Sequence, residues 1–172
     1  KIHHLESVAE YNAMLGVETL HPLVSVVDLS EAHPMRHFRQ TYGFYAVFLK
    51  EIKCGDMIYG RHYYDYQEGT LVCLAPGQVI GFEDDGREFQ PKGWALVFHP
   101  DLIRGTSLGR NMKEYGFFSY EVNEALHLSE RERGMVVDCF GKIRHELEHA
   151  IDRHSRRLIA INIEMPVSYT HL

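Results

Sequence analysis

The sequence predicts a mainly β protein, a jelly-roll barrel or sandwich, followed by two C-terminal helices. Three observations predict this fold class. Short segments rich in β-branched and aromatic residues occupy the chain up to residue 98, and turn-forming residues separate them at short intervals. After residue 128 the apolar residues recur with a helical period instead.

The strand segments share a high content of Tyr, Phe, Val and Ile. They are residues 24–29, 42–52, 57–66, 70–74, 79–82 and 93–98. Turn signals such as Cys54-Gly55-Asp56 and Ala75-Pro76-Gly77 fall between them. Short strands spaced in this way are typical of a sandwich or jelly-roll barrel. The strand segments do not alternate with helical segments, so the sequence does not predict a parallel sheet.

The first predicted helix spans residues 130–151. Ser129 and Glu132 have the spacing of a capping box, which marks a helix start. The residues that follow place one apolar stripe on a helix face: Val136, Cys139, Phe140, Ile143, Leu147 and Ile151. A stripe of this kind predicts a helix that packs against the β domain.

The second predicted helix spans residues 153–165, with Asp152 as its N-cap. Leu158, Ile161 and Met165 lie on one side of this helix, whereas Ile159 and Ile163 lie on another. Because one barrel covers only one side, we expect Leu158, Ile161 and Met165 to form the interface of a homodimer.

Proline cannot continue a helix without losing a backbone hydrogen bond, so Pro166 is expected to end the second helix. Residues 166–172 have no helical period and are predicted to be a tail that is disordered or foreign to the natural sequence. The expected organisation is therefore a barrel at 1–128, a helical dimerisation segment at 129–165 and this tail.

Charge and composition exclude several classes of function. The chain has 172 residues, with 18 Lys+Arg against 24 Asp+Glu and a net charge of -6, which opposes binding to nucleic acid. No apolar run approaches the roughly 20 residues of a membrane span. The three cysteines form no CxxC pair. We expect a cytoplasmic protein that has no membrane partner.

Histidine patterns raise the question of a metal. The run His145-Glu146-Leu147-Glu148-His149 matches the zinc-peptidase signature, but a helical projection points both histidines away from the apolar stripe. The barrel segment 60–69 holds His62 alone and no H-x-H pair. We therefore expect no metal, no cofactor and no catalytic residue.

A small barrel leaves an interior wide enough for one small ligand. Side chains that could line it combine an aromatic or cationic group with hydrogen-bonding capacity. The candidates for ligand binding are Tyr45, Arg61, Tyr63, Trp94 and His99. The strand face that points into the barrel is left open, because the sequence does not define strand parity.

Several stretches together resemble one known family. They are Tyr59-Gly60-Arg61, residues 66–71, Ala75-Pro76-Gly77-Gln78, and residues 93–102, 115–120, 123–129, 146–152 and 154–159. In these stretches the chain resembles the N-terminal cupin domain of AraC-type bacterial transcription regulators. The resemblance reaches to about Met165.

The resemblance implies a cupin-like barrel that senses a small-molecule effector and helices that pair two protomers. It also implies that DNA is bound only through a C-terminal domain with two helix-turn-helix motifs, which is missing from this chain. Two alternatives stay open. One is a cupin-superfamily enzyme, such as a metal-dependent isomerase or dioxygenase. The other is a dimerisation or carbohydrate-binding module without a regulatory role.

Overall fold

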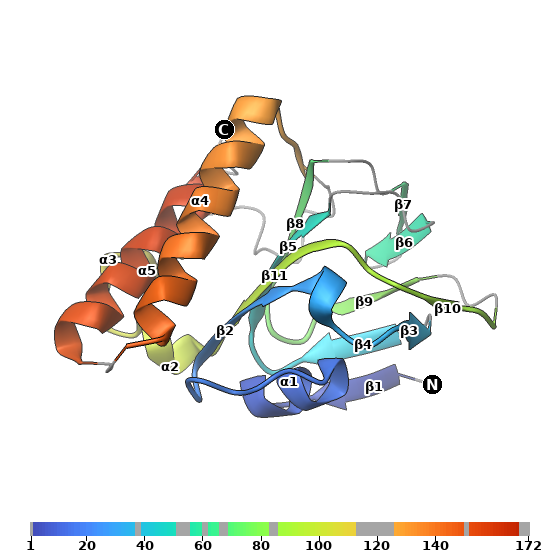
Figure 1. Ribbon diagram of the computed structural model, residues 1–172, viewed down its shortest axis with the longest axis horizontal. Helices are drawn as coiled ribbons and strands as arrows, with labels where there is room; N and C mark the ends of the chain where they lie inside the picture. Colours follow the sequence, from blue (N-terminus) through green and yellow to red (C-terminus); the bar gives the residue numbers. More distant parts are fainter. Residues whose placement is uncertain are drawn as a thin grey trace.

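The computed structural model describes residues 2–36, 39–50, 56–59, 62–65, 69–82, 86–112, 126–149 and 152–168, with side chains for all of these except 56–59, 62–65 and 82. Two helices cover one face of a β-sheet, and a second sheet lies on the opposite side of it (Figure 1). The described part of the chain is therefore mixed α and β, with its strands in several sheets.

The sheet under the helices, called here the helix-facing sheet, has the strand order β12-β8-β5-β11-β2 and is antiparallel throughout. Its strands are β2 (Val24–Asp28), β5 (Tyr45–Lys50), β8 (Thr70–Leu74), β11 (Gly93–Phe98) and β12 (Leu126–His127). The central strands β5 and β11 pair along their whole length, from Tyr45 opposite Phe98 to Lys50 opposite Gly93.

The second sheet has the order β1-β4-β9-β6-β7. Its strands are β1 (Ile2–Leu5), β4 (Arg39–Tyr42), β6 (Asp56–Tyr59), β7 (His62–Asp65) and β9 (Val79–Phe82). Strands β1 and β4 are parallel, and the other pairs are antiparallel. A separate ribbon pairs β3 (Met35–Arg36) with β10 (Glu88–Phe89).

Every predicted strand segment contains an observed strand, and the segment 57–66 contains two, β6 and β7. Strand pairing among the described residues does not join the two five-stranded sheets into one closed barrel. The closed jelly-roll arrangement therefore stays a prediction.

The helices are α1 (Val8–Leu15), the 3-10 turn η1 (Leu29–Glu31), α2 (Pro100–Ile103), α3 (Ser107–Asn111), α4 (Glu130–Leu147) and α5 (Arg153–Ser168). The sequence analysis missed α1, although its signals are local. Ser7 and Glu10 form a capping box at its start, and Gly16, with a φ of 75°, ends it in the left-handed conformation.

The start of α4 confirms the predicted capping box. The Glu132 backbone N–H donates to the Ser129 hydroxyl at 3.2 Å, and the Ser129 N–H donates to the Glu132 carboxylate at 2.9 Å. The helix ends at Leu147, four residues before the predicted end at 151. Its buried side chains are those of the predicted stripe within this range: Val136, Cys139, Phe140, Ile143 and Leu147.

Helix α5 begins as predicted and ends later than predicted. The Ser155 N–H donates to the Asp152 carboxylate at 2.9 Å, which confirms the N-cap. The expectation that Pro166 ends the helix is wrong, because α5 continues through Pro166 to Ser168. Proline lacks the N–H that would donate a helical hydrogen bond, and the burial of Val167, which is 0% exposed, compensates for the free energy lost with that bond. Residues 166–168 therefore belong to the packed domain and not to a tail.

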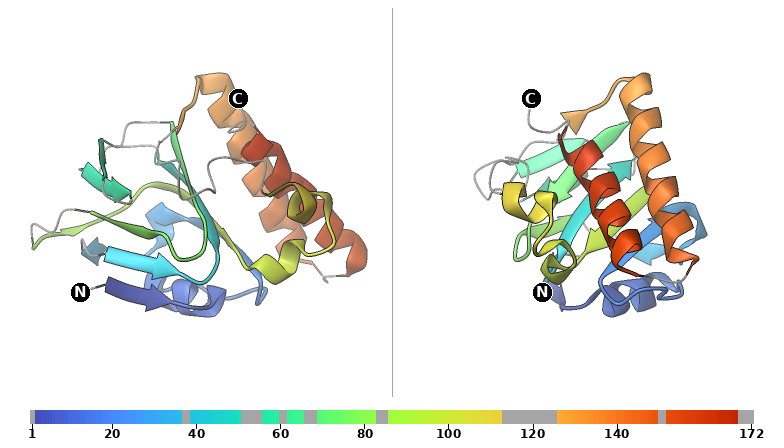
Figure 2. Two further views of the ribbon diagram at one scale, coloured as in Figure 1. Left: turned by 180° about the vertical axis from the view of Figure 1, so that it is seen from behind. Right: turned by 90° about the vertical axis from the view of Figure 1, so that its left-hand side faces the viewer.

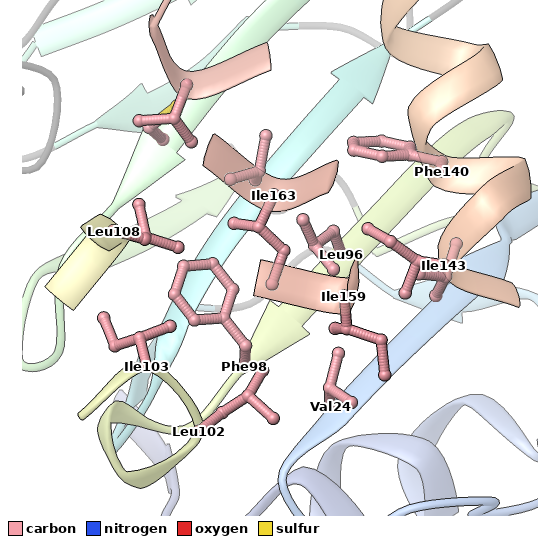
Figure 3. Close-up of a cluster of buried hydrophobic side chains, with 14 of the residues drawn as sticks. Val24, Leu96, Phe98, Leu102, Ile103, Leu108, Phe140, Ile143, Ile159 and Ile163 are labelled. Carbon is pink, nitrogen blue, oxygen red and sulfur yellow. The ribbon is translucent and has the colours of Figure 1, made fainter. Parts of the chain in front are cut away.

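Helices α4 and α5 lie side by side over the helix-facing sheet (Figure 2). Between them and the sheet lies an apolar core that also takes in α2 and α3. Figure 3 labels ten of its members: Val24, Leu96, Phe98, Leu102, Ile103, Leu108, Phe140, Ile143, Ile159 and Ile163. Arg156 anchors α5 against α2 by donating to the carbonyl oxygens of Asp101 and Leu102.

A second core lies on the opposite face of the same sheet, between the two sheets and α1. It contains Tyr11 and Leu15 from α1, Tyr42 and Ile80 from the second sheet, and Phe48, Val72 and Val97 from the helix-facing sheet. The rings of Tyr42 and Phe44 stack at 4.9 Å between centroids, and Tyr11 meets both rings edge-on. The candidate site lies in this core.

Candidate effector-binding cavity

The alternation of side chains along β5 decides what faces the second core. Tyr45, Val47 and Leu49 belong to the helix-facing core. Ala46 and Phe48 belong to the core between the sheets, and Lys50 continues their side of the strand. One strand therefore delivers apolar residues to the helices and a lysine to the space between the sheets.

A cavity of about 40 Å³ lies between the sheets. Its lining residues come from α1, η1, both sheets and the β3–β10 ribbon: Tyr11, Met14, Leu29, Met35, Arg36, Gln40, Tyr42, Phe48, Lys50, Ile80, Gly81, Phe89 and Pro91. This volume is enough for a few water molecules. The walls are mostly apolar, with a few polar groups among them, which is the usual composition of a small-molecule site.

Three of the polar groups form a connected set. The Tyr42 hydroxyl donates to Gln40 Oε1 at 2.5 Å, and Gln40 Nε2 donates to Met14 Sδ at 3.3 Å. Tyr42 and Gln40 are both buried. An amide nitrogen carries two hydrogens and a thioether is a weak acceptor, so the Gln40 amide retains donor capacity for a ligand.

Two cations line the same cavity. Lys50 is only 5% exposed, and its ammonium nitrogen lies 5.6 Å from the centre of the Phe48 ring. Arg36, on β3, is exposed and reaches the cavity from the solvent side. Burial raises the pKa of the Tyr11 hydroxyl, so this lining group remains neutral. Among the described residues that line the cavity, none is Asp or Glu.

The structure places three of the sequence-predicted ligand residues away from this cavity. Trp94 lies on the same face of β11 as Leu96 and Phe98, and its ring lies 5.5 Å from the Arg144 guanidinium of α4. Tyr45 stacks on Phe98 at 5.2 Å in the helix-facing core.

The third is His99, whose Nδ1 accepts a hydrogen bond from the Asp101 N–H at 3.0 Å and so caps α2. Tyr45, Trp94 and His99 therefore do not line this cavity, and their role in ligand binding stays a prediction. Tyr63 lies in β7, but its side chain is outside the described part of the structure, as is the whole of Arg61.

The cavity residues that the sequence analysis missed are Arg36, Gln40, Tyr42 and Lys50. One signal was available for Lys50, because a lysine at the end of the apolar run 45–49 is unusual in a buried strand. Both faces of β5 are apolar, however, so the run itself does not show which face meets the helices.

The histidines of the zinc-like run point outward, as predicted. His145 and His149 are both exposed, and their ring centroids are 4.5 Å apart. His149 Nδ1 lies 2.7 Å from the backbone oxygen of His145. In the described part of the chain, no three His, Cys, Asp or Glu side chains gather closely enough to hold a metal ion. The side chain of His62 is outside that part.

The residues predicted for a dimer interface form an outward side of α5. Ile161 is 49% and Met165 45% exposed, and Leu158 is half-buried. Leu158 also lines a surface groove of about 550 Å³ between α4 and α5, together with Val137 and Asn162. The inner side of the helix carries the buried residues Ile159 and Ile163. Helix α5 therefore has two apolar sides, and the described residues cover only one of them.

None of the described helices is long and apolar enough to cross a membrane. Neither a protein-family model nor a curated protein matches the chain.

Proposed function

We propose that this chain is the effector-sensing and dimerisation module of an AraC-type transcription regulator. In this proposal the two sheets correspond to the cupin-like jelly roll of that family, and DNA binding belongs to a domain outside this chain. The observation that carries the proposal is the cavity between the sheets, where Lys50, Gln40 and Tyr42 meet apolar walls.

The energetics of the polar groups support a binding role. A buried amide or ammonium is often less favourable for stability than well-packed apolar side chains, even where other groups bond to it. Polar side chains retained beside a cavity are therefore expected to contribute to recognition of a ligand.

Binding without chemistry fits the lining residues best. The described lining residues include no carboxylate, histidine or cysteine, so they supply neither a carboxylate or histidine base nor a thiol nucleophile. Cys73 and Cys139 are buried free thiols, and burial raises the pKa of the Cys73 thiol. Unreactive free thiols agree with the proposed cytoplasmic location.

The outward side of α5 supports dimerisation. An isologous contact would pair the exposed Ile161 and Met165 of one protomer with the same residues of a second protomer. The groove between α4 and α5 adjoins this side and offers room for side chains of the second protomer.

Mass spectrometry of the protein purified under native conditions tests the sensing role. We expect a small molecule that co-purifies with the chain and is released on denaturation. If neither this experiment nor a broad metabolite screen by thermal shift finds a ligand, the sensing proposal fails. Catalytic turnover of a bound metabolite would favour the enzyme alternative instead.

Sedimentation velocity tests the dimer. We expect the wild-type chain to be dimeric at micromolar concentrations and the double variant Leu158→Glu/Ile161→Glu to be monomeric and folded, because it places like charges in the contact. The matched control is Ile2→Glu/Leu20→Glu, which changes two other exposed apolar residues in the same way. If the wild type is monomeric, or the control dissociates as well, this interface is wrong.

A further inference from the structure

Strand β2 is an edge of the helix-facing sheet (Figure 1). Among the described strands, β11 alone pairs with it. An edge strand has backbone N–H and C=O groups on its outer side that can pair with a further strand. The five residues of β2 all line one groove of about 290 Å³ that is open to solvent, called here the β2 groove. The outer side of β2 therefore borders a space that a ligand can enter.

The pairing of β2 with β11 shows which backbone groups face this groove. The His99 N–H donates to the Leu23 carbonyl oxygen at 2.8 Å, so these two residues form a hydrogen-bonded antiparallel pair. Such pairs recur at every second residue, and in this register Ser25 and Val27 also bond to β11. The residues that alternate with them direct their N–H and C=O groups into the groove: Val24, Val26 and Asp28.

The accessible part of this edge begins at Val26. Val24 is only 1% exposed, whereas Val26 is 9% exposed and Asp28 is half-buried. The N–H and C=O groups of Val26 and the N–H of Asp28 can therefore bond to an extended chain laid beside β2. Specific recognition by so short an edge also requires contacts with the walls of the groove.

The walls of the β2 groove are acidic and apolar. Glu18, Glu31 and Glu148 bring exposed carboxylates from three places, the loop after α1, η1 and the end of α4. Leu20, which is 53% exposed, adds an apolar side chain. Among the described lining residues Arg144 is the only cation, and its guanidinium packs over the tryptophan ring of β11 at 5.5 Å. These walls are complementary to a partner that has both cationic and apolar side chains.

The same carboxylates oppose a second copy of this chain at the β2 edge. Two β2 strands paired with each other would bring the carboxylates of both grooves together, and like charges across an interface are unfavourable. Charged side chains beside an edge strand are a known protection against such self-pairing. A positively charged segment of another protein meets no such repulsion, so charge complementarity selects it as the occupant.

We propose that the β2 groove docks an extended segment of a partner protein that combines lysine or arginine with apolar residues. The segment adds a strand to the helix-facing sheet by bonding to Val26 and Asp28. Its cationic side chains lie near the three glutamates, and an apolar side chain contacts Leu20. This surface is separate from the cavity between the sheets, so the inference does not depend on the proposed sensing function.

Fluorescence anisotropy with three labelled hexapeptides tests the chemistry of the partner. The first peptide alternates lysine and valine, and the second alternates glutamate and valine. The third is the lysine–valine peptide methylated at every backbone nitrogen, which keeps the charges but removes the N–H donors. We expect the first peptide to bind about tenfold or more tightly than either of the others.

Each result of this comparison decides one part of the proposal. Equal binding of the glutamate–valine peptide would overturn the basic partner, and equal binding of the methylated peptide would overturn the addition of a strand. If the lysine–valine peptide does not bind even at millimolar concentration, the β2 groove is not a docking site for such a segment.

Amide hydrogen exchange followed by NMR locates the bound peptide. In the free protein, the amides of Ser25 and Val27, which bond to β11, should exchange more slowly than those of Val26 and Asp28. A saturating lysine–valine peptide should slow exchange at Val26 and Asp28 about tenfold or more and leave the other two amides unchanged. If Val26 and Asp28 are protected in the protein alone and lose this protection on dilution, a second copy occupies the edge and the proposed partner is wrong.

Charge-reversal variants test the acidic walls. Glu18→Lys/Glu31→Lys should weaken binding of the lysine–valine peptide about tenfold or more, because it places two cations beside the docked segment. The matched control is Glu88→Lys/Glu130→Lys, which reverses two exposed glutamates outside the groove, in β10 and at the start of α4. Equal weakening in both variants would indicate a general effect of net charge and would overturn the assignment of the segment to this groove.

Discussion

The two faces of the helix-facing sheet differ in what they bury. The face under α4 and α5 buries apolar side chains, such as Leu49, Leu96 and Phe98. The opposite face also buries polar groups, among them Lys50 and, across the cavity, Gln40. The first face is composed as expected for stability alone, whereas the second buries polar groups, which is less favourable for stability than an apolar core.

Two neighbouring residues of β5 give the sharpest test of this difference. Leu49→Ala should lower the free energy of unfolding by about 2–5 kcal/mol, because it leaves a cavity in the apolar core. Lys50→Met should lower it less, by about 1–3 kcal/mol, because it removes the polar contacts of a buried ammonium but leaves an apolar side chain of similar length in place. Urea denaturation followed by circular dichroism measures both changes.

A loss of about 3–5 kcal/mol in Lys50→Met would contradict this comparison. It would show that Lys50 belongs to an ion pair on which folding depends. Both faces of the sheet would then contribute to stability to a similar degree.

Val167 tests whether the end of α5 belongs to the helix-facing core. Its side chain is fully buried, so Val167→Ala should lower the free energy of unfolding by about 2 kcal/mol. Ser168→Ala is the control, since Ser168 is exposed and its hydroxyl bonds to the nearby Met165 carbonyl. If Val167→Ala and Ser168→Ala both leave the thermal denaturation unchanged, residues 166–168 do not contribute to the core and behave as a tail.

The smallest expected effect concerns the N-cap of α5. Hydrogen bonds from the Ser155 and His154 backbone hold the pKa of Asp152 below its usual value of 3.8. A carboxyl group with a lowered folded-state pKa stabilises the fold above pH ~4, and this contribution is lost as the pH falls through the lowered pKa.

Asp152→Asn should therefore reduce the loss of stability between about pH 5 and pH 2 while keeping a side chain that can cap the helix. Thermal denaturation across this range measures it. An identical pH profile for the variant and the wild type would show that the cap carboxylate contributes nothing measurable.

Local signals in the sequence were sufficient for β2, β5 to β9 and β11, and for the starts and caps of both C-terminal helices, but not for β1, β3, β4, β10 and β12. Ser129, Glu132 and Asp152 act on backbone groups within three residues of themselves, and the apolar stripe of α4 reflects the period of one helix. The same local reading placed His145 and His149 on the outward side of the chain, where the structure has them.

Only the tertiary structure decided which face of each strand meets which layer. Both faces of β5 are covered, so its sequence has no hydrophobic alternation, and the sides of Tyr45 and Lys50 follow from pairing with β8 and β11. The same holds for Val167, whose burial against residues far away in the chain carries α5 past Pro166. Such contacts join segments distant in sequence, and no local pattern encodes them.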